Sequence, residues 1–506
     1  YIPQGERRYL APQDGDSLYL TIDQNIQYIV ERELEKAVHD TGSKRGMGII
    51  ANPHTGELLA IASYPRFDPN EYNKYPAKNR RNPLFTDMYE PGSTFKVFTA
   101  AAALEEGKVS LDSEFFDPGF IVVEDRRIKC WKAGGHGRQT FTEAVENSCN
   151  PVFATLAMRI GKDALYKYIK SFGFGSLSGI DFPGESPGSL QPISRVKNVE
   201  LSNIGFGQGV AVTPLQMVMG VASIANGGAL LKPYLVKKIV SPGGKVKLEN
   251  KRQVVREVIS EETARTMRDL MRSVVTNGSG VRAYLEGYRV AGKTGTAEKV
   301  VQGQKGYSQL IASFIGFAPA DDPRLVGMVI LDEPSCPVKY GGVIAAPVVG
   351  SIFRDSLRYL GVKPVFEPQV LEKLNEQEVI VPNLLNRPIA EALALLQKSK
   401  INYRLIGRGS FVYDQVPKPG VKINRQTKVL IYFDPEEKYQ SGKIKLILPN
   451  LQGLSVSKAE QILSELGLSL EAQGKGNAVE QHPSAGTVVE SGSKIIVLFK
   501  PEPKTP

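Results

Sequence analysis

The sequence offers little material for metal, cofactor or membrane chemistry. Its 506 residues include only three cysteines and four histidines. These form neither a C-x-x-C nor an H-E-x-x-H pattern, so we expect no metal site and no cofactor. No apolar run reaches about 18 residues and no signal peptide is visible, so no membrane-spanning helix is predicted within the chain. Because residue 1 is Tyr, we expect the chain to be cut from a longer protein.

Positive residues outnumber negative residues only slightly. Hydrophobic residues make up 42% and charged residues 23% of the chain, values typical of a globular protein. The length of 506 residues predicts two to four domains. The net charge is +10, of which +6 lies from residue 379 onward, where 17 Lys and Arg face 11 Asp and Glu. We interpret this excess as a solvated basic surface, with attraction to an anionic polymer as the alternative. Because no nucleic-acid motif accompanies it, we expect no nucleic-acid partner.

The stretch around which the chain is organised covers residues 89–107. Pro91 and Gly92 predict a break, and the Ala-rich run that follows predicts a buried helix that Ser93 can cap. Lys96 follows Ser93 by three residues, so its amine and the hydroxyl share one helix face. A serine beside a lysine at a helix N-terminus is a candidate nucleophile.

Two further motifs distinguish this pair from other S-x-x-K matches. The same spacing begins at Ser194, Ser455 and Ser491, where a cap or a turn explains it. Ser93 is followed in order by an S-x-N motif, at Ser148 and Asn150, and by a K-T-G-T motif on strand-like sequence. The residues of the last motif are Lys293, Thr294, Gly295 and Thr296.

Together the motifs supply the parts of an acyl transfer. Ser93 would attack a carbonyl while Lys96 accepts its proton. Ser148 would relay a proton toward the leaving amine, and Asn150 would orient Lys96 or the substrate amide. Residues 293–296 would hold a substrate carboxylate and align the peptide. Since lowering a lysine pKa from about 10.4 to about 7 costs about 4 to 5 kcal/mol, we expect a closed, partly dry cleft.

Two rival motifs fit the chain less well. Gly287 to Thr294 match the Walker A pattern and a strand ending in Asp332 resembles Walker B, but Gly295 follows where a P-loop needs a helix. Residues 184–188 match G-x-S-x-G, yet Pro187 lacks the N–H that an oxyanion hole requires. A P-loop ATPase is therefore kept only as an alternative.

Hydrophobic periodicity predicts a mixed helix-and-strand domain before residue 362. Helices are predicted over residues 23–38, 93–107, 140–160, 162–172, 213–225, 259–276 and 344–360. Within residues 140–160, Pro151 is expected to mark a kink or a new start. Strands are predicted over residues 46–51, 57–63, 288–294, 309–318 and 325–331. Residues 67–88 are predicted as a loop and residues 110–138 as irregular.

An internal repeat follows. Val381-Pro382-Asn383-Leu384 recurs 67 residues later as Leu448-Pro449-Asn450-Leu451, and each copy precedes a short helix, a Gln-containing turn and an alternating strand. We therefore predict two small α+β modules. The expected boundaries are a linker remnant (1–16), a catalytic domain (17–362), a linker (363–378), modules at 379–435 and 443–501, and a tail (502–506).

The ordered trio at Ser93, Ser148 and Lys293 resembles the active-site set of class B penicillin-binding proteins, the peptidoglycan D,D-transpeptidases. The repeats resemble PASTA domains. This resemblance implies an α+β fold, in which a serine β-lactamase/transpeptidase-like domain with an antiparallel sheet and an α-helical subdomain precedes the modules. It also implies a D-Ala-D-Ala stem peptide as donor, β-lactams as its mimics, and the motif residues in the roles given above.

The resemblance further implies a location at the extracytoplasmic face of a bacterial membrane, through an N-terminal anchor that is missing here. A glycosyltransferase or cell-wall synthesis complex is the implied partner. Alternatives within the chemistry are a D,D-carboxypeptidase or a β-lactamase-like hydrolase. An alternative outside it is a non-catalytic wall-binding or penicillin-sensing protein.

The cysteines point to a subfamily. The surroundings of Cys130 and Cys149 resemble the sporulation branch of the family. Cys149 lies between Ser148 and Asn150, and is either a small buried thiol or the partner of Cys130 in a redox pair. A disulfide formed in an oxidising space would displace the S-x-N turn and lower acylation.

Overall fold

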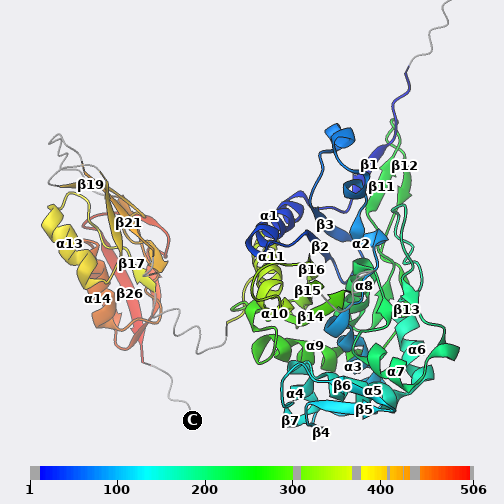
Figure 1. Cartoon of the computed structure of the whole chain (residues 1–506). Coiled ribbons are helices and arrows are strands. Elements are labelled where there is room, and N and C mark those ends of the chain that lie inside the picture. Colours follow the sequence, from blue (N-terminus) through cyan, green and yellow to red (C-terminus); the bar gives the residue numbers. More distant parts are fainter. Residues whose placement is uncertain are drawn as a thin grey trace, which may run out of the picture. The chain divides into compact units, whose positions relative to one another are not determined.

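The computed structural model describes residues 12–299, 309–366, 378–406, 411–424, 427–433 and 445–501. It divides into two compact units, Tyr1–Val365 and Phe366–Pro506 (Figure 1). The predicted tail, most of the two predicted linkers and the ends of the predicted modules at 434–435 and 443–444 lie outside the described residues.

A five-stranded antiparallel sheet forms the centre of the first unit, in the order β14-β15-β16-β2-β3. Its strands are β14 (Ala291–Lys299), β15 (Gln309–Ala318), β16 (Leu325–Asp332), β2 (Arg45–Ala51) and β3 (Leu58–Tyr64). Along β16, Val326, Met328 and Ile330 enter one core while Val329 and Leu331 enter the other. Successive side chains therefore point to opposite faces of the sheet. Both faces are buried because helices cover each side.

Helices α1 (Gln24–Thr41) and α11 (Ala346–Tyr359) pack side by side on one face of the sheet (Figure 1). The opposite face carries α8 (Pro214–Ala225), every residue of which is buried, and α9 (Glu261–Thr276) packs against β14. Asp23 caps α1 by accepting from two backbone N–H groups, as the sequence predicted. The predicted antiparallel sheet and its covering helices are confirmed.

The middle of this unit's sequence forms the predicted helical subdomain. Its helices are α3 (Lys96–Glu105), α4 (Phe141–Glu146), α5 (Asn150–Ile160), α6 (Lys162–Ser171) and α7 (Asn198–Gly205). Residues 96–103 of α3 are all buried, as its apolar sequence predicted. The predicted capping role of Ser93 is wrong: Ser93 lies inside a 3₁₀ turn, η3 (Gly92–Phe95), that has no side-chain cap.

Two other predictions need correction. Residues 110–138 are not irregular but hold short paired strands, β4 (Glu114–Asp117), β5 (Phe120–Val123) and β6 (Arg126–Lys129), followed by β7 (Gly137–Thr140). Four-residue strands are too short to show a period in sequence. The predicted loop over 67–88 holds short turns, η1 (Pro69–Lys74), η2 (Ala77–Arg80) and α2 (Pro83–Thr86). The kink or new start expected at Pro151 within residues 140–160 is confirmed, since α4 ends at Glu146 and α5 begins at Asn150.

Small sheets complete the first unit. They are formed by β1 (Ser17–Leu20), β11 (Val236–Val240) and β12 (Val246–Glu249), by β10 (Ala229–Leu231) and β13 (Val254–Glu257), and by β8 (Ser189–Leu190) and β9 (Val210–Ala211). None of the helices in the described residues has the length and apolar character needed to cross a membrane.

The second unit contains two modules with the same topology. In the first, β18 (Tyr403–Ile406), β21 (Val429–Phe433) and β19 (Val412–Val416) form a sheet beside α13 (Ile389–Lys398), and β17 (Glu378–Ile380) pairs with β20 (Lys422–Asn424). The second repeats this with β23 (Ser469–Gly474), β26 (Lys494–Lys500), β24 (Asn477–His482), α14 (Val456–Glu465), β22 (Lys445–Ile447) and β25 (Val488–Glu490). Each module has its own hydrophobic core.

The repeated sequence has a repeated structural purpose. Gln415 accepts from the Leu384 N–H at 2.8 Å and donates to the Pro382 carbonyl at 3.0 Å. Gln481 makes the same pair of bonds, to Leu451 at 2.8 Å and to Pro449 at 3.0 Å. One Gln amide, buried in the first module and partly buried in the second, therefore pairs with a backbone N–H and a carbonyl of each Pro-Asn-Leu turn.

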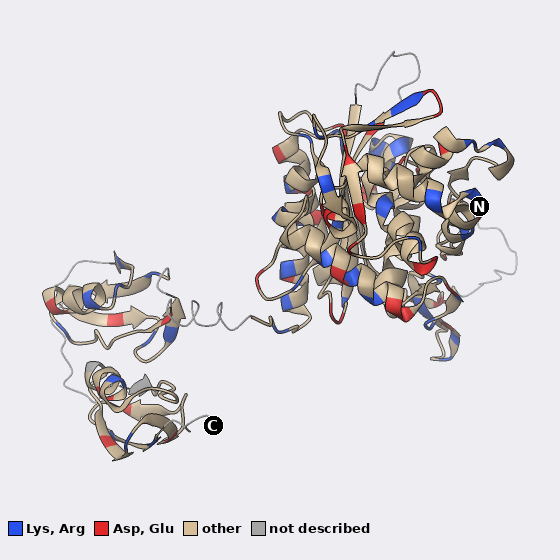
Figure 2. Ribbon diagram, turned by 90° about the horizontal axis from the view of Figure 1, so that it is seen from below, with Lys and Arg blue, Asp and Glu red and all other residues tan. Residues whose placement is uncertain are grey.

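Charge is spread over both units. In the view of Figure 2, Lys and Arg are interspersed with Asp and Glu on the first unit and on the modules. This distribution favours the interpretation of the excess positive charge as a solvated surface.

Candidate active site

The turn that carries Ser93 lies directly against strand β14. Gly92 has a φ of 55°, a conformation that favours glycine, and a Cβ there would lie 3.2 Å from the Cβ of Ala297. At Gly295 a Cβ would come within 2.8 Å of the Thr94 side chain. Glycines on both sides thus allow η3 and β14 to approach closely. Ser93 is half-buried at this junction, while its neighbours Gly92 and Thr94 are buried.

Lys96 is fully buried one turn after Ser93. Its Nζ donates to the Ser148 carbonyl at 2.7 Å, to Asn150 Oδ1 at 2.6 Å and to Ser148 Oγ at 3.2 Å. It also lies 5.4 Å from the centre of the Phe153 ring. The S-x-x-K and S-x-N motifs are therefore joined by direct hydrogen bonds.

Burial lowers the pKa of Lys96 to about 7, although Cys149 and Cys130 act in the opposite direction. A shift of this size corresponds to about 5 kcal/mol of lost solvation for the ammonium form. About half of the molecules would then hold a neutral amine near neutral pH. Within the described residues, this amine forms no hydrogen bond with the Ser93 hydroxyl.

Ser148 occupies a backbone conformation that side chains seldom adopt. Its φ is 54°, in the left-handed region, where a non-glycine residue costs about 1 kcal/mol or more. The turn between α4 and α5 is held by bonds from the Ser148 N–H to the Val145 carbonyl and from the Cys149 N–H to the Ala144 carbonyl. This strained turn presents both the carbonyl and the hydroxyl of Ser148 to Lys96.

The K-T-G-T motif lies on β14, at the edge of the sheet. Lys293 is fully buried, and burial together with the charge of Lys96 lowers its pKa well below the ordinary value. The Thr294 hydroxyl lies 2.9 Å from the Ser279 hydroxyl, and the Thr296 hydroxyl accepts from the Gly341 N–H at 3.1 Å. Since the charge of Lys96 acts on Lys293 and β14 packs on η3, the third motif joins the other two.

The strand also decides against the nucleotide-binding alternative. A P-loop requires a helix to begin at its Lys-Thr pair, whereas Lys293 and Thr294 continue an extended strand. Asp332, the supposed Walker B residue, is paired with Arg45 at 2.7 Å and with Lys299 at 3.2 Å. The predicted strand over 288–294 is shifted, because Arg289 has a φ of 43° and the strand begins at Ala291.

Sequence reasoning missed two polar residues next to the S-x-N motif. Asp117, at the end of β4, and His136, before β7, are both buried beside Cys130 and Cys149. No motif spacing connects the four, and the strands that bring them together were not predicted. Cys130 and Cys149 are free thiols in the structure.

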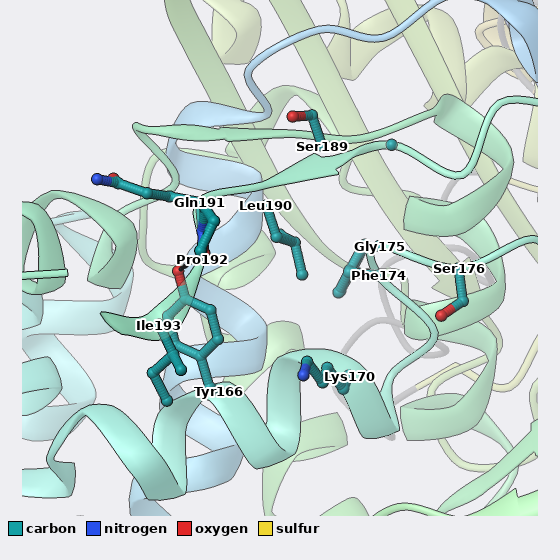
Figure 3. A pocket seen from close by; sticks show the side chains of 11 residues that line it. Tyr166, Lys170, Phe174, Gly175, Ser176, Ser189, Leu190, Gln191, Pro192 and Ile193 are labelled. Atoms are coloured by element: carbon teal, nitrogen blue, oxygen red, sulfur yellow. Dashed lines mark hydrogen bonds between the residues drawn. The ribbon is translucent and has the colours of Figure 1, made fainter. Parts of the chain in front are cut away.

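A pocket of about 540 Å³ lies elsewhere in the unit, between α6 and the chain around β8. Figure 3 shows Tyr166, Leu190 and Ile193 among the side chains that line it. None of the motif residues contributes to this pocket. The candidate active site is therefore defined by its chemistry and not by that hollow.

Comparison with known proteins agrees with this geometry. Residues 46–354 match the family model of the penicillin binding protein transpeptidase domain, and residues 379–435 and 446–501 match that of the PASTA domain. Stage V sporulation protein D of Bacillus subtilis is 44% identical over 447 residues, which are 87% of this chain and 69% of that protein. Probable peptidoglycan D,D-transpeptidase PenA of Neisseria gonorrhoeae is 34% identical over 71% of this chain and 59% of its own length.

Solved structures give the same result. Penicillin binding protein 3 of Mycobacterium tuberculosis, complexed with aztreonam, superposes with a TM-score of 0.66 at 31% identity, covering 72% of this chain and 83% of that one. The transpeptidase domain of penicillin-binding protein 3 from Burkholderia pseudomallei gives 0.60 at 30% identity, over 69% of this chain and 98% of that one. This chain belongs to the penicillin-binding protein transpeptidase family and carries two PASTA domains.

Proposed function

We propose that the chain is a peptidoglycan D,D-transpeptidase that cross-links stem peptides through an acyl-enzyme at Ser93. The observation that carries the proposal is the buried Lys96 amine, bonded to Ser148 and Asn150 beside the half-exposed Ser93. A base of pKa about 7 can take the serine proton at neutral pH.

In the first half-reaction, Ser93 Oγ attacks the carbonyl of the penultimate D-alanine and its proton passes to Lys96. The C–N bond to the terminal D-alanine then breaks, and Ser148 hands the leaving amine a proton drawn from Lys96. Asn150 holds the Lys96 amine in place. In the second half, an amine of a neighbouring stem peptide attacks the ester and restores Ser93.

The K-T-G-T strand would bind the substrate. Lys293, Thr294 and Thr296 would offer an amine and two hydroxyls to the terminal carboxylate of the donor, whose negative charge would favour the ammonium form of Lys293. Gly295 has no side chain and so lets η3 approach the strand, and the Thr296 N–H, with that of Ser93, would receive the oxyanion. β-Lactams would acylate Ser93 by the same route. Cleavage of the ring amide would leave the amine attached to the acyl group, so no leaving group would dissociate.

Labelling by a fluorescent penicillin tests this mechanism. Ser93→Ala should abolish labelling, whereas Ser194→Ala, which removes the serine of another S-x-x-K match, should leave it intact. Labelling that survives Ser93→Ala would contradict the proposal, and its absence from the wild type would favour the wall-binding or penicillin-sensing alternative. Incubation with a D-Ala-D-Ala donor, with and without an amine acceptor, separates a transpeptidase from a carboxypeptidase or other hydrolase.

The biological setting is part of the same proposal. The likeness to the B. subtilis sporulation protein supports a place in the sporulation branch. We propose that the full-length protein is anchored at the extracytoplasmic face of the cell membrane and works with a glycosyltransferase. Co-purification of the full-length protein with membranes and with such an enzyme during spore formation is the test.

A further inference from the structure

The pocket between α6 and β8 takes no part in the proposed mechanism. It encloses about 540 Å³, a volume usual for small-molecule sites. Tyr166 and Lys170 line it from α6, Phe174 from the turn after that helix, and Leu190 and Ile193 from the chain around β8. In Figure 3, the Leu190 side chain points from β8 toward α6. The hollow is therefore large enough for a small organic ligand.

Hydrogen bonds hold the walls of this pocket in place. From the buried helix α8, Gln216 Nε2 donates to the Ser176 carbonyl at 2.9 Å and to the Pro187 carbonyl at 2.8 Å. The Tyr166 hydroxyl donates to the Gln191 carbonyl at 2.8 Å and so joins α6 to the chain after β8. The pocket is therefore formed before any ligand enters, and a ligand would not need to order its walls.

The charges around the pocket favour an anion. Lys170 is exposed at its rim, and none of the described carboxylates forms an ion pair with it. The Arg256 guanidinium, which donates to the Lys170 carbonyl at 3.2 Å, adds a second positive charge nearby. Among the described residues that line the pocket, none is acidic, whereas Phe174 and Leu190 offer apolar surface. A ligand with one negative group and a short apolar part fits this arrangement.

We propose that this pocket is an effector site for a small amphipathic carboxylate. The carboxylate would pair with the Lys170 ammonium, and the apolar part would lie against Phe174 and Leu190. Two sources share this chemistry: the C-terminal end of a stem peptide, which rests on the proposed function, and a short fatty acid. Binding involves no covalent step, so Ser93 remains the nucleophile for either source.

Phe174 connects the pocket to the catalytic turn. Its ring is fully buried, and the ring centre lies 5.1 Å from that of Phe95 and 4.9 Å from that of Phe98. Phe95 is the last residue of η3, two positions after Ser93. Because protein interiors are close-packed and transmit strain, a ligand against Phe174 changes the packing behind the nucleophile. We therefore expect occupancy of the pocket to alter the rate at which Ser93 is acylated.

Binding to the whole chain, with Ser93 first acylated by penicillin, tests the proposal. The blocked active site cannot take a probe, so saturation-transfer NMR titration reports a second site. The probes are octanoate for the fatty acid and diacetyl-Lys-D-Ala-D-Ala for the peptide, and the one that binds identifies the source. Lys170→Met and Leu190→Trp, which fills the hollow, should each weaken binding by about fivefold or more. Lys162→Met, which removes an exposed lysine at the other end of α6, should bind as the wild type does.

The effector role is tested by the acylation rate. The bound probe should change the rate constant for a chromogenic β-lactam by about fivefold or more in the wild type. Lys170→Met should lose this change, although competition at Ser93 remains the same in both proteins. Equal effects of the probe on the two proteins would overturn the connection through Phe174.

Two further results would overturn the inference. One is wild-type protein that binds neither probe. The other is Lys170→Met and Leu190→Trp that are folded by circular dichroism and bind as tightly as the wild type. Octanoate binding does not depend on the transpeptidase reaction, so it can fail while penicillin labelling succeeds. It can also be measured on a chain that penicillin does not label, so the failure of the proposed function is seen separately.

Discussion

The proton affinity of Lys96 allows a quantitative prediction about acylation. If the neutral amine is the base, the rate of penicillin acylation should follow the neutral fraction of a group whose pKa is about 7. That fraction is about 9% at pH 6, about 50% at pH 7 and about 91% at pH 8. The second-order rate constant should therefore rise about tenfold from pH 6 to pH 8 and then level off.

Asn150→Asp moves this midpoint in a known direction. Asn150 Oδ1 lies 2.6 Å from the amine, so the variant places a carboxylate of the same shape against the ammonium. An opposite charge at this distance raises a pKa by about one to three units. The midpoint should move to about pH 8 to 10, and the rate at pH 7 should fall by about 5-fold to about 500-fold.

Stopped-flow acylation by a chromogenic β-lactam, over pH 6 to 10, measures both profiles. Asn70→Asp is the matched control, because it makes the same change at an exposed residue of η1, and its profile should equal that of the wild type. A wild-type rate that stays flat between pH 6 and pH 8, or an Asn150→Asp midpoint that does not move, would refute the role of Lys96 as the neutral base.

The remaining predictions concern stability. Lys96→Met should abolish labelling. It should also change the pH dependence of the free energy of unfolding, because the pKa of Lys96 is lower in the folded than in the unfolded chain. The stability that the neutral lysine contributes is fully present above about pH 10.5 and is lost as the pH falls to about 7. The wild type should thus gain about 1.4 kcal/mol per pH unit relative to the variant in that window, as measured by denaturant titration; equal slopes would contradict the burial argument. Gly92→Ala should destabilise the catalytic unit by about 1 to 3 kcal/mol, since its φ is 55° and Ala297 is close, whereas Gly107→Ala, with a similar φ and nothing within 4 Å, should cost less. Differential scanning fluorimetry compares the two, and an equal loss would rule out the contact with Ala297 as the cause. Gln415→Ala should make the first module sensitive to protease, because the Leu384 N–H and the Pro382 carbonyl would lose their partner, at a cost of about 1 to 3 kcal/mol of stability each. Penicillin labelling should stay at the wild-type level. An unchanged digestion pattern would show that the module does not need this amide.

The sequence predicted those helices and strands whose hydrophobic periodicity matches the side chains that are buried in the structure. The apolar run after Ser93, the hydrophobic period of α1 and the strands around β15 and β16 each carry enough residues to show their periodicity. The ordered motifs also predicted which three segments should meet, and their residues do lie together.

What escaped prediction depends on contacts between distant segments. Ser148 adopts a positive φ because the turn between α4 and α5 is anchored on both sides, and nothing in the residues themselves requires it. The four-residue strands β4 to β7 are stable only as pairs. The approach of Asp117 and His136 to the cysteines depends on those pairs, so no reading of spacing could reveal it.

The independence of the two module cores bears on how such a chain can change over time. Each module has its own buried core and its own bridging glutamine, and the partly buried Ile380 of the first module also packs against the core of the second. A module can therefore be duplicated or deleted while the buried residues of the other module's core stay in place. Related proteins are free to differ in module number while keeping the same transpeptidase domain.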